Sequence, residues 1–332
     1  MEELKDKVSR LAQQSHWKGQ LLRSLLVLAL RSKVQEGNTQ QAQEVFDVLK
    51  NTSGYFEGGS TGVLLEIVQQ LKAQIGELEA AAASDAAKKQ ELNKILSGFT
   101  TFLDKLSEQP ATLSEDLVGF VSNSYSGMKK HKKAADLLAK IPQPQPLPPN
   151  PNEKPEEKDK REQEDRRKEA FHRHVRLTYV RELRLDKQFD KASAEIKKIL
   201  SAWGRNNLDV QKEQIFILED EEKYAAAANM WSRLMQEKLK PYLGKDNRLT
   251  EQYFECYYHR VWCIYKFGMK QTDADKKQKY VNQAANLILQ LDKSKITLAD
   301  YLKKKFDDLL KQETPLRKQY DELKKGEKAV RR

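Results

Sequence analysis

Two segments of the chain repeat one spacing of large and small apolar residues. In FDKASAEIKKIL (189–200), an aromatic residue is followed by alanine three positions on, then by two large apolar residues at steps of four. YAAAANMWSRLM (224–235) has the same order at an offset of 35 residues. Residues three and four apart share one face of a helix. The spacing therefore predicts two helices, each with an apolar stripe whose small alanine lets a neighbouring helix approach closely.

The alanine spacing recurs with weaker flanks elsewhere in the chain. Ala42, Ala134 and Ala284 are each followed by large apolar residues at similar steps. A second helical pattern precedes the clearer copies, as in RHVRLTYVRELRLD before Ala192 and DVQKEQIFILEDEE before Ala227. One helix pair in each period of about 35 residues is typical of a helical solenoid.

No stretch of alternating β-branched residues bounded by turn signals interrupts these patterns, so the predicted fold class is all-α. Seven of the ten prolines fall between Pro142 and Pro155, where they exclude a helix and favour an extended spacer. We therefore expect a solenoid in two parts joined by a proline-rich linker. The expected divisions are a helical repeat region at 1–141, a linker at 142–163, a second repeat region at 164–302 and a basic C-terminal helix and tail at 303–332.

The repeated spacing resembles that of the tetratricopeptide repeat family, whose second helix runs from an aromatic residue through alanine to large apolar residues. The resemblance is best over 171–236, extends to 21–50 and 117–142, and is stretched by insertions around 253–291. The first helices depart from the family, which has tryptophan sixteen residues before the alanine. This chain has Arg176, Gln211, Val118 and Leu26 there. The repeats are degenerate, and a non-repetitive helical bundle with the same spacing is the alternative.

The resemblance implies a groove lined by the first helix of each pair, in which an extended peptide or a helix of a partner protein binds. The family's contact positions lie eight, eleven, fifteen and eighteen residues before the alanine. The lysine and asparagine with which the family clamps acidic C-terminal tails are not reproduced, because Leu177 replaces the basic residue. The groove positions carried over to this chain are His174, Leu177, Arg181, Arg184, Asp209, Lys212, Phe216 and Glu219.

The segment YFECYYHRVWCIYKFG (253–268) combines both cysteines with a histidine at helical spacing. Cys256, His259 and Cys263 would lie along one stripe, which raises the hypothesis of a zinc or iron site. Seven helical residues separate the cysteine backbones by about 10.5 Å, whereas zinc holds each sulfur at about 2.3 Å. Both thiolates could hardly reach one ion, so we predict no metal here. A metal-dependent enzyme centred on this segment is the weaker alternative.

Apolar residues surround the same segment on every side, which indicates a helix packed between neighbours. Free cysteine behaves there as a small buried residue. The segment is expected to be the best-buried helix of the C-terminal array, and replacing Trp262 is expected to unfold that region.

The net charge of +11 is concentrated in the second part of the chain. Residues 1–141 hold 18 basic against 17 acidic side chains, and the remainder ends in LKKGEKAVRR (323–332). A basic surface favours anionic partners. The alternative function is therefore a basic helical-repeat protein that binds RNA or DNA phosphates non-specifically through this region. The interleaved acids favour the simpler interpretation, a lysine-rich solvated helix surface.

The remaining motifs limit the function further. No nucleophile–base grouping or glycine-rich phosphate loop is complete, so we expect neither an enzyme nor a cofactor. Two cysteines form no disulfide framework, and LLRSLLVLAL (21–30) is too short to span a bilayer, so a cytoplasmic protein is expected. The sequence predicts a non-enzymatic protein–protein interaction scaffold.

Overall fold

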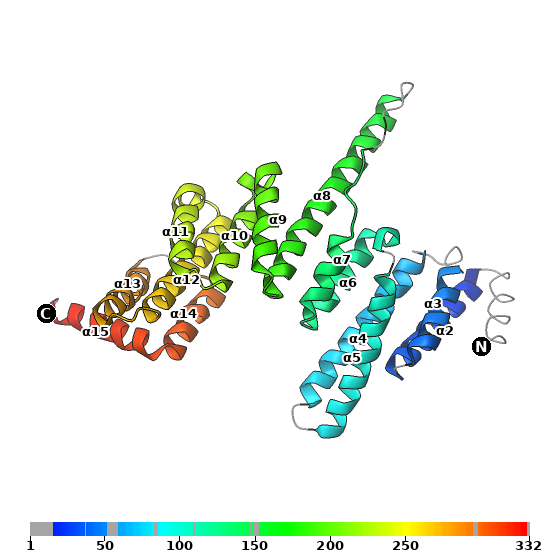
Figure 1. The fold of residues 1–332 in the computed structure, drawn as a ribbon, viewed down its shortest axis with the longest axis horizontal. Helices are drawn as coiled ribbons and strands as arrows, with labels where there is room; N and C mark the ends of the chain where they lie inside the picture. Colours follow the sequence, from blue (N-terminus) through cyan, green and yellow to red (C-terminus); the bar gives the residue numbers. More distant parts are fainter. Residues whose placement is uncertain are drawn as a thin grey trace. The chain divides into compact units, whose positions relative to one another are not determined.

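The structure, a computed structural model, describes residues 16–36, 38–51, 59–82, 85–108, 110–146, 148, 153–294 and 298–330. The chain divides into two compact units, Met1–Glu182 and Leu183–Arg332. Every regular element in these ranges is helical (Figure 1), which confirms the predicted all-α class.

The first unit contains the helices up to most of α8. They are α2 (His16–Gln35), α3 (Thr39–Asn51), α4 (Gly59–Ala82), α5 (Ala86–Leu106), α6 (Glu115–Gly127), α7 (His131–Ala139) and α8 (Pro155–Leu185), with a 3₁₀ turn at Pro110–Thr112. Neighbouring helices pack in pairs, α2 on α3, α4 on α5 and α6 on α7. Leu30, Leu71, Phe99 and Leu103 are fully buried between them.

The described part of the proline-rich segment is not helical until Pro155, where α8 begins. Proline suits the first turn of a helix because its missing N–H would have no partner there. The charged residues after it extend α8 as a long polar helix. Glu153 supports its start through the guanidinium of Arg161, whose Nε lies 3.0 Å from the carboxylate.

The second unit begins at the end of α8 and contains the remaining helices. They are α9 (Phe189–Ala202), α10 (Leu208–Asp220), α11 (Tyr224–Leu234), α12 (Asn247–Met269), α13 (Ala274–Lys293), α14 (Asp300–Gln312) and α15 (Thr314–Val330). A 3₁₀ turn at Gly204–Asn206 precedes α10, and a π-helical turn at Met235–Leu239 and a 3₁₀ turn at Lys240–Tyr242 follow α11. From α9 to α13 each helix packs on the next (Figure 1).

One turn geometry recurs between consecutive helices. Lys129, Lys187 and Glu222 adopt left-handed backbone conformations, with φ of 57°, 61° and 60°. In each case the next residue donates its N–H to the carbonyl five residues back, at 2.8 Å. This is the Schellman arrangement, which satisfies carbonyls left open at a helix end. A side chain at such a φ costs about 1 kcal/mol. The same backbone bond, from Asn38 to Lys33 at 2.9 Å, closes α2 before α3.

A buried alanine follows each of these three turns at the same distance. Ala134, Ala192 and Ala227 lie five residues after the left-handed position, and none has any exposed surface. The second helices begin at the equivalent residues His131, Phe189 and Tyr224. The burial predicted from the alanine spacing is therefore confirmed for these positions.

The pair α12–α13 meets through a glycine instead. A Cβ atom placed on Gly268 would lie 2.6 Å from the Cβ of Tyr280, so a larger residue would force the helices apart. Ala284 on α13 is also fully buried. The same alanine spacing therefore occurs in a helix pair whose turn is different. Asp273 starts α13 by accepting hydrogen bonds from the N–H groups of Asp275 and Lys276.

Helix α12 is covered along nearly its whole length. Every residue from Gln252 to Met269 is buried or half-buried, and Cys256, Val261, Cys263 and Tyr265 are completely enclosed. The expectation that this segment packs between neighbouring helices is confirmed.

Enlarging a buried alanine should destabilise the protein selectively. Ala227→Leu places extra methyl groups in a closed helix contact and should cost about 1–3 kcal/mol of unfolding free energy. Ala225→Leu adds the same group at an exposed position of the same helix and should change stability by less than about 0.5 kcal/mol. Urea denaturation followed by circular dichroism measures the unfolding free energy of both variants. An equal decrease in the two variants would show that the close contact at Ala227 does not restrict the size of the side chain there.

Candidate functional site

Three of the groove residues predicted from the sequence lie on α8 within the first unit. His174 and Arg181 are exposed and Leu177 is half-buried. Their spacing puts them along one side of the helix. On the same helix, the buried carboxylate of Glu182 lies 2.8 Å from Nδ1 of His131 on α7. That pair fastens α8 to the α6–α7 pair.

Arg184 belongs to the second unit and is committed to contacts inside it. Its Nε donates to the buried Glu213 at 2.6 Å, and a second nitrogen bonds Asp220. The guanidinium also lies over the Phe216 ring, with its carbon 5.4 Å from the centroid. The two acids hold the pKa of Arg184 above its ordinary value despite the opposing effect of burial. Arg184 thus joins the start of the unit to α10.

Lys212 is likewise engaged, in a contact that joins α10 to α12. Its Nζ donates to Glu255 at 2.6 Å, and Lys305 on α14 approaches the other oxygen of Glu255 at 3.6 Å. Burial alone would raise the pKa of Glu255, but the hydrogen bond and charge of Lys212, with Lys305, hold it below its ordinary value. Asp209 lies exposed in the first turn of α10.

Glu219 is the centre of a buried polar cluster. Its Oε1 accepts hydrogen bonds from Nε1 of Trp231 at 2.5 Å and from Sγ of Cys263 at 3.1 Å, and its Oε2 lies 3.1 Å from Nδ1 of His259. His259 stacks on Trp231 with ring centroids 5.2 Å apart, while Phe216 meets both rings edge-on. A buried carboxylate is tolerated when donors satisfy it in this way.

The four second-unit residues other than Asp209 are therefore placed as follows: Arg184, Phe216 and Glu219 meet around α10, whereas Lys212 contacts α12 separately. That these side chains contact a partner stays a prediction. Sequence reasoning missed the partners of Glu219, since Trp231, His259 and Cys263 lie 12 to 44 residues away. The signal available was the acidic residue directly after the apolar run IFIL (215–218), in the helix that precedes one carrying a tryptophan.

Both cysteines are free and buried. Burial raises the pKa of Cys256 to about 12, and burial together with the charge of Glu219 raises the pKa of Cys263 still further. Among the residues that the structure describes, no three His, Cys, Asp or Glu side chains are arranged to hold a metal ion. The side chains of Cys256, His259 and Cys263 do not meet at one point, because those of His259 and Cys263 contact Glu219.

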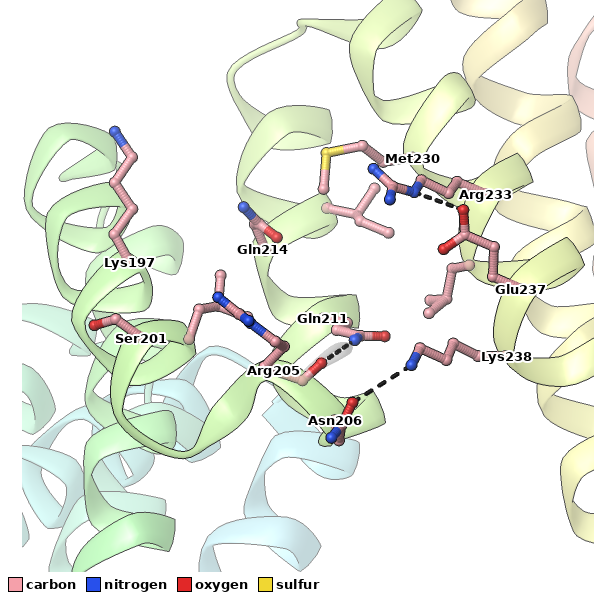
Figure 2. Close-up of a pocket in the computed structure, with 13 residues that line it drawn as sticks. Lys197, Ser201, Arg205, Asn206, Gln211, Gln214, Met230, Arg233, Glu237 and Lys238 are labelled. Atoms are coloured by element: carbon pink, nitrogen blue, oxygen red, sulfur yellow. Dashed lines mark hydrogen bonds and ion pairs between the residues drawn. The ribbon is translucent and has the colours of Figure 1, made fainter.

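A cavity of about 650 Å³ opens between α9 and α11, over α10 (Figure 2). We call it the basic cavity because four cationic side chains and one carboxylate border it. Its apolar surface comes from Leu200, Ile215, Met230 and Leu234. The charged and polar residues around it are Lys197, Ser201, Arg205, Asn206, Gln211, Gln214, Arg233, Glu237 and Lys238.

Several of the C-terminal basic residues lie near acids. On α14, Lys303 lies 3.6 Å from Asp300, and Lys311 lies 3.8 Å from Asp308. On α15, Lys324 lies 3.7 Å from Asp292 of α13 and bonds the Tyr320 hydroxyl. Exposed pairs of this kind contribute little to stability, but they reduce the positive potential available to a polyanion.

No protein-family model and no curated protein sequence matches this chain. In the described ranges, none of the helices combines the length and apolar character needed to cross a bilayer.

Trp231 should matter more to folding than Trp262. Trp231 is fully buried against Glu219 and His259, whereas Trp262 is half-buried. Trp231→Ala should therefore lower the unfolding free energy by about 3–5 kcal/mol, and Trp262→Ala by about 1–2 kcal/mol. Denaturant unfolding monitored by circular dichroism compares them. A larger loss for Trp262→Ala would contradict the packing described for α11 and α12.

The cysteines should resist modification until the protein unfolds. Because thiolate is the reactive form, the raised pKa of Cys256 keeps it protonated at pH 8.5 in the folded protein. Both thiols should react with a disulfide reagent in guanidinium and neither at a comparable rate in buffer. The unfolded thiol loses its proton near pH 9, so stability should also fall as the pH rises from about 9 towards about 12. Rapid native-state reaction of one thiol would contradict its burial.

Proposed function

We propose that this protein is a non-enzymatic protein–protein interaction scaffold whose helix pairs stack as tetratricopeptide-like repeats. The observation that carries the proposal is the recurrence, in both units, of one left-handed turn followed five residues later by a fully buried alanine. A repeated pair cannot bury its apolar face alone and does so against its neighbours. Stacks built in this way present long surfaces to extended peptides or to helices of other proteins.

The state of the buried acids supports a binding role over a catalytic one. Glu182, Glu213 and Glu219 are enclosed, and each is satisfied by a side chain of a neighbouring helix. A general acid or base must reach a substrate atom within hydrogen-bonding distance. These carboxylates are instead placed to join helices, so their arrangement is that of a structural framework.

Partner recognition along α8 is supported by the exposure of His174 and Arg181, with Leu177 half-buried between them. In the second unit Arg184, Lys212 and Glu219 hold the helices in place. We assign them a structural role, in which they set the shape of the surface. Non-specific nucleic-acid binding has less support, because acids pair with many of the basic side chains of α14 and α15.

Site-specific photocrosslinking in the full-length chain tests the scaffold proposal. A photoreactive amino acid at His174 should give protein adducts in native lysate, identified by mass spectrometry, that excess unlabelled protein suppresses. The matched control replaces Lys160, an exposed residue nearer the start of α8, and should give few adducts.

Two results would count against the scaffold. Equal adducts at the His174 and Lys160 positions would indicate non-specific contact. Adducts that disappear on nuclease treatment, with binding that collapses between low and moderate salt, would favour the nucleic-acid alternative.

A further inference from the structure

The basic cavity lies on the side of the second helices. Its walls come from α9 and α11, the helices that follow the left-handed turns at Lys187 and Glu222, and its floor from α10 (Figure 2). The groove positions inferred from the family resemblance instead lie on first helices. In the second unit those positions are filled by contacts such as Arg184 with Glu213 and Lys212 with Glu255. The cavity is therefore a separate surface with a composition of its own.

Its charge is unbalanced. Glu237 is the carboxylate among the lining residues, and it already accepts a hydrogen bond from Nε of Arg233 at 2.8 Å. Lys238 reaches the amide oxygen of Asn206 at 3.4 Å, a neutral and long contact. Within the part of the chain that the structure describes, Lys197 and Arg205 form no ion pair. Three cationic groups therefore surround the opening without an acidic partner, and anions bind such groups through charge-assisted hydrogen bonds.

The interior between these charges is apolar and large enough for side chains. Leu200, Ile215, Met230 and Leu234, from three helices, line it, and Leu200 and Met230 are the more exposed of the four. The volume of about 650 Å³ falls within the range of ligand-binding clefts, about 300–1,000 Å³. Met230, with its flexible thioether, can adapt to the shape of an inserted group. An occupant that matches the cavity has an aliphatic centre and negative charges on both sides.

These properties favour a peptide over a nucleic acid. Single-stranded nucleic acids bind through bases stacked on aromatic side chains in a basic groove, and the lining contains aliphatic but no aromatic residues. The amide groups of Gln211, Gln214 and Asn206 offer both donors and acceptors, which suits a peptide backbone. Gln211 is directed across the cavity floor by its bond to the backbone oxygen of Arg205 (Figure 2).

We propose that the basic cavity between α9 and α11 binds an acidic peptide segment of a partner protein, with leucine-type side chains inserted against Leu200, Met230 and Leu234. Carboxylates on either side of these side chains pair with Lys197, Arg205 and Lys238. The inference rests on the proposed scaffold function and names one of its contact surfaces and the chemistry of the partner.

Fluorescence anisotropy with a defined probe tests this site in the full-length protein. The probe is a fluorescein-labelled peptide, DEDLLDED, in which two leucines are flanked by acids. The double variant Arg205→Glu/Lys238→Glu should weaken binding by about tenfold or more, because it replaces two attractive charges with repulsive ones. Ser201→Trp should also weaken it, since the indole fills the cavity without changing its charge.

Matched controls separate the site from general charge effects. Lys276→Glu/Lys279→Glu makes the same change in net charge at exposed positions of α13 and should leave binding within about twofold. The peptide DEDGSDED, which lacks the leucines, should bind the unmodified protein about tenfold more weakly. Circular dichroism confirms that each variant is folded; all the substituted residues are exposed, so folding is expected.

The inference is overturned by any of three results. These are failure of the peptide to bind the unmodified protein, equal binding of the peptide to both double variants, and displacement of the peptide by a single-stranded oligothymidylate at equal concentration. If the photocrosslinks at His174 persist in any of these cases, the scaffold proposal stands and only this site is lost. If the peptide binds at the cavity but no crosslinks form at His174, the interaction surface of the protein lies on α9 and α11 instead of on α8.

Discussion

The close approach of paired helices at a residue without a long side chain is the constraint on which the rest of the structure depends. At Ala134, Ala192 and Ala227 the second helix meets its neighbours with no exposed surface, and at Gly268 the backbone itself is in contact with Tyr280. The left-handed turns at Lys187 and Glu222 set the alanine in register, because the second helix begins two residues later in each case. The strain of those turns costs about 1 kcal/mol each. This is small beside the free energy gained when a correctly closed pair buries its apolar area.

Around this framework the protein uses buried acids to fix neighbouring helices in one arrangement. Glu219 joins α10 to α11 through Trp231 and to α12 through His259 and Cys263. Removing one partner of such a cluster would leave a polar atom unsatisfied. Because a buried polar group costs more when unsatisfied than its hydrogen bond contributes when made, such a cluster disfavours alternative packings. Directional bonds of this kind complement the apolar contacts, which tolerate sliding.

Much of the fold could be predicted from local spacing, and the site could not. Apolar positions at steps of three and four gave the starts of α9 and α11 and the burial of Ala192 and Ala227, because helix geometry links spacing to one face. The periodicity of apolar residues shows which face of a helix is buried but not how deeply each side chain lies. It therefore did not distinguish the fully buried Trp231 from the half-buried Trp262. The basic cavity draws residues from α9, α10 and α11 and the turns beside them. No short motif encodes it, since it exists only when side chains from separate helices come together.

The sequential packing of the second unit has a consequence for how it opens. From α9 to α13 each helix packs on the next, so most of its contacts join residues close in sequence. Chains with such local contacts fold quickly, because little loop entropy is lost before contacts form. Disruption at one end is also felt mainly by the adjoining helices. The α14–α15 end does not share this property, because α14 packs back on α12 and α15 on α13, with Leu302 and Leu316 fully buried. We therefore expect α9 to open more readily than α14 and α15, whose amide hydrogens should stay protected together with those of α12 and α13.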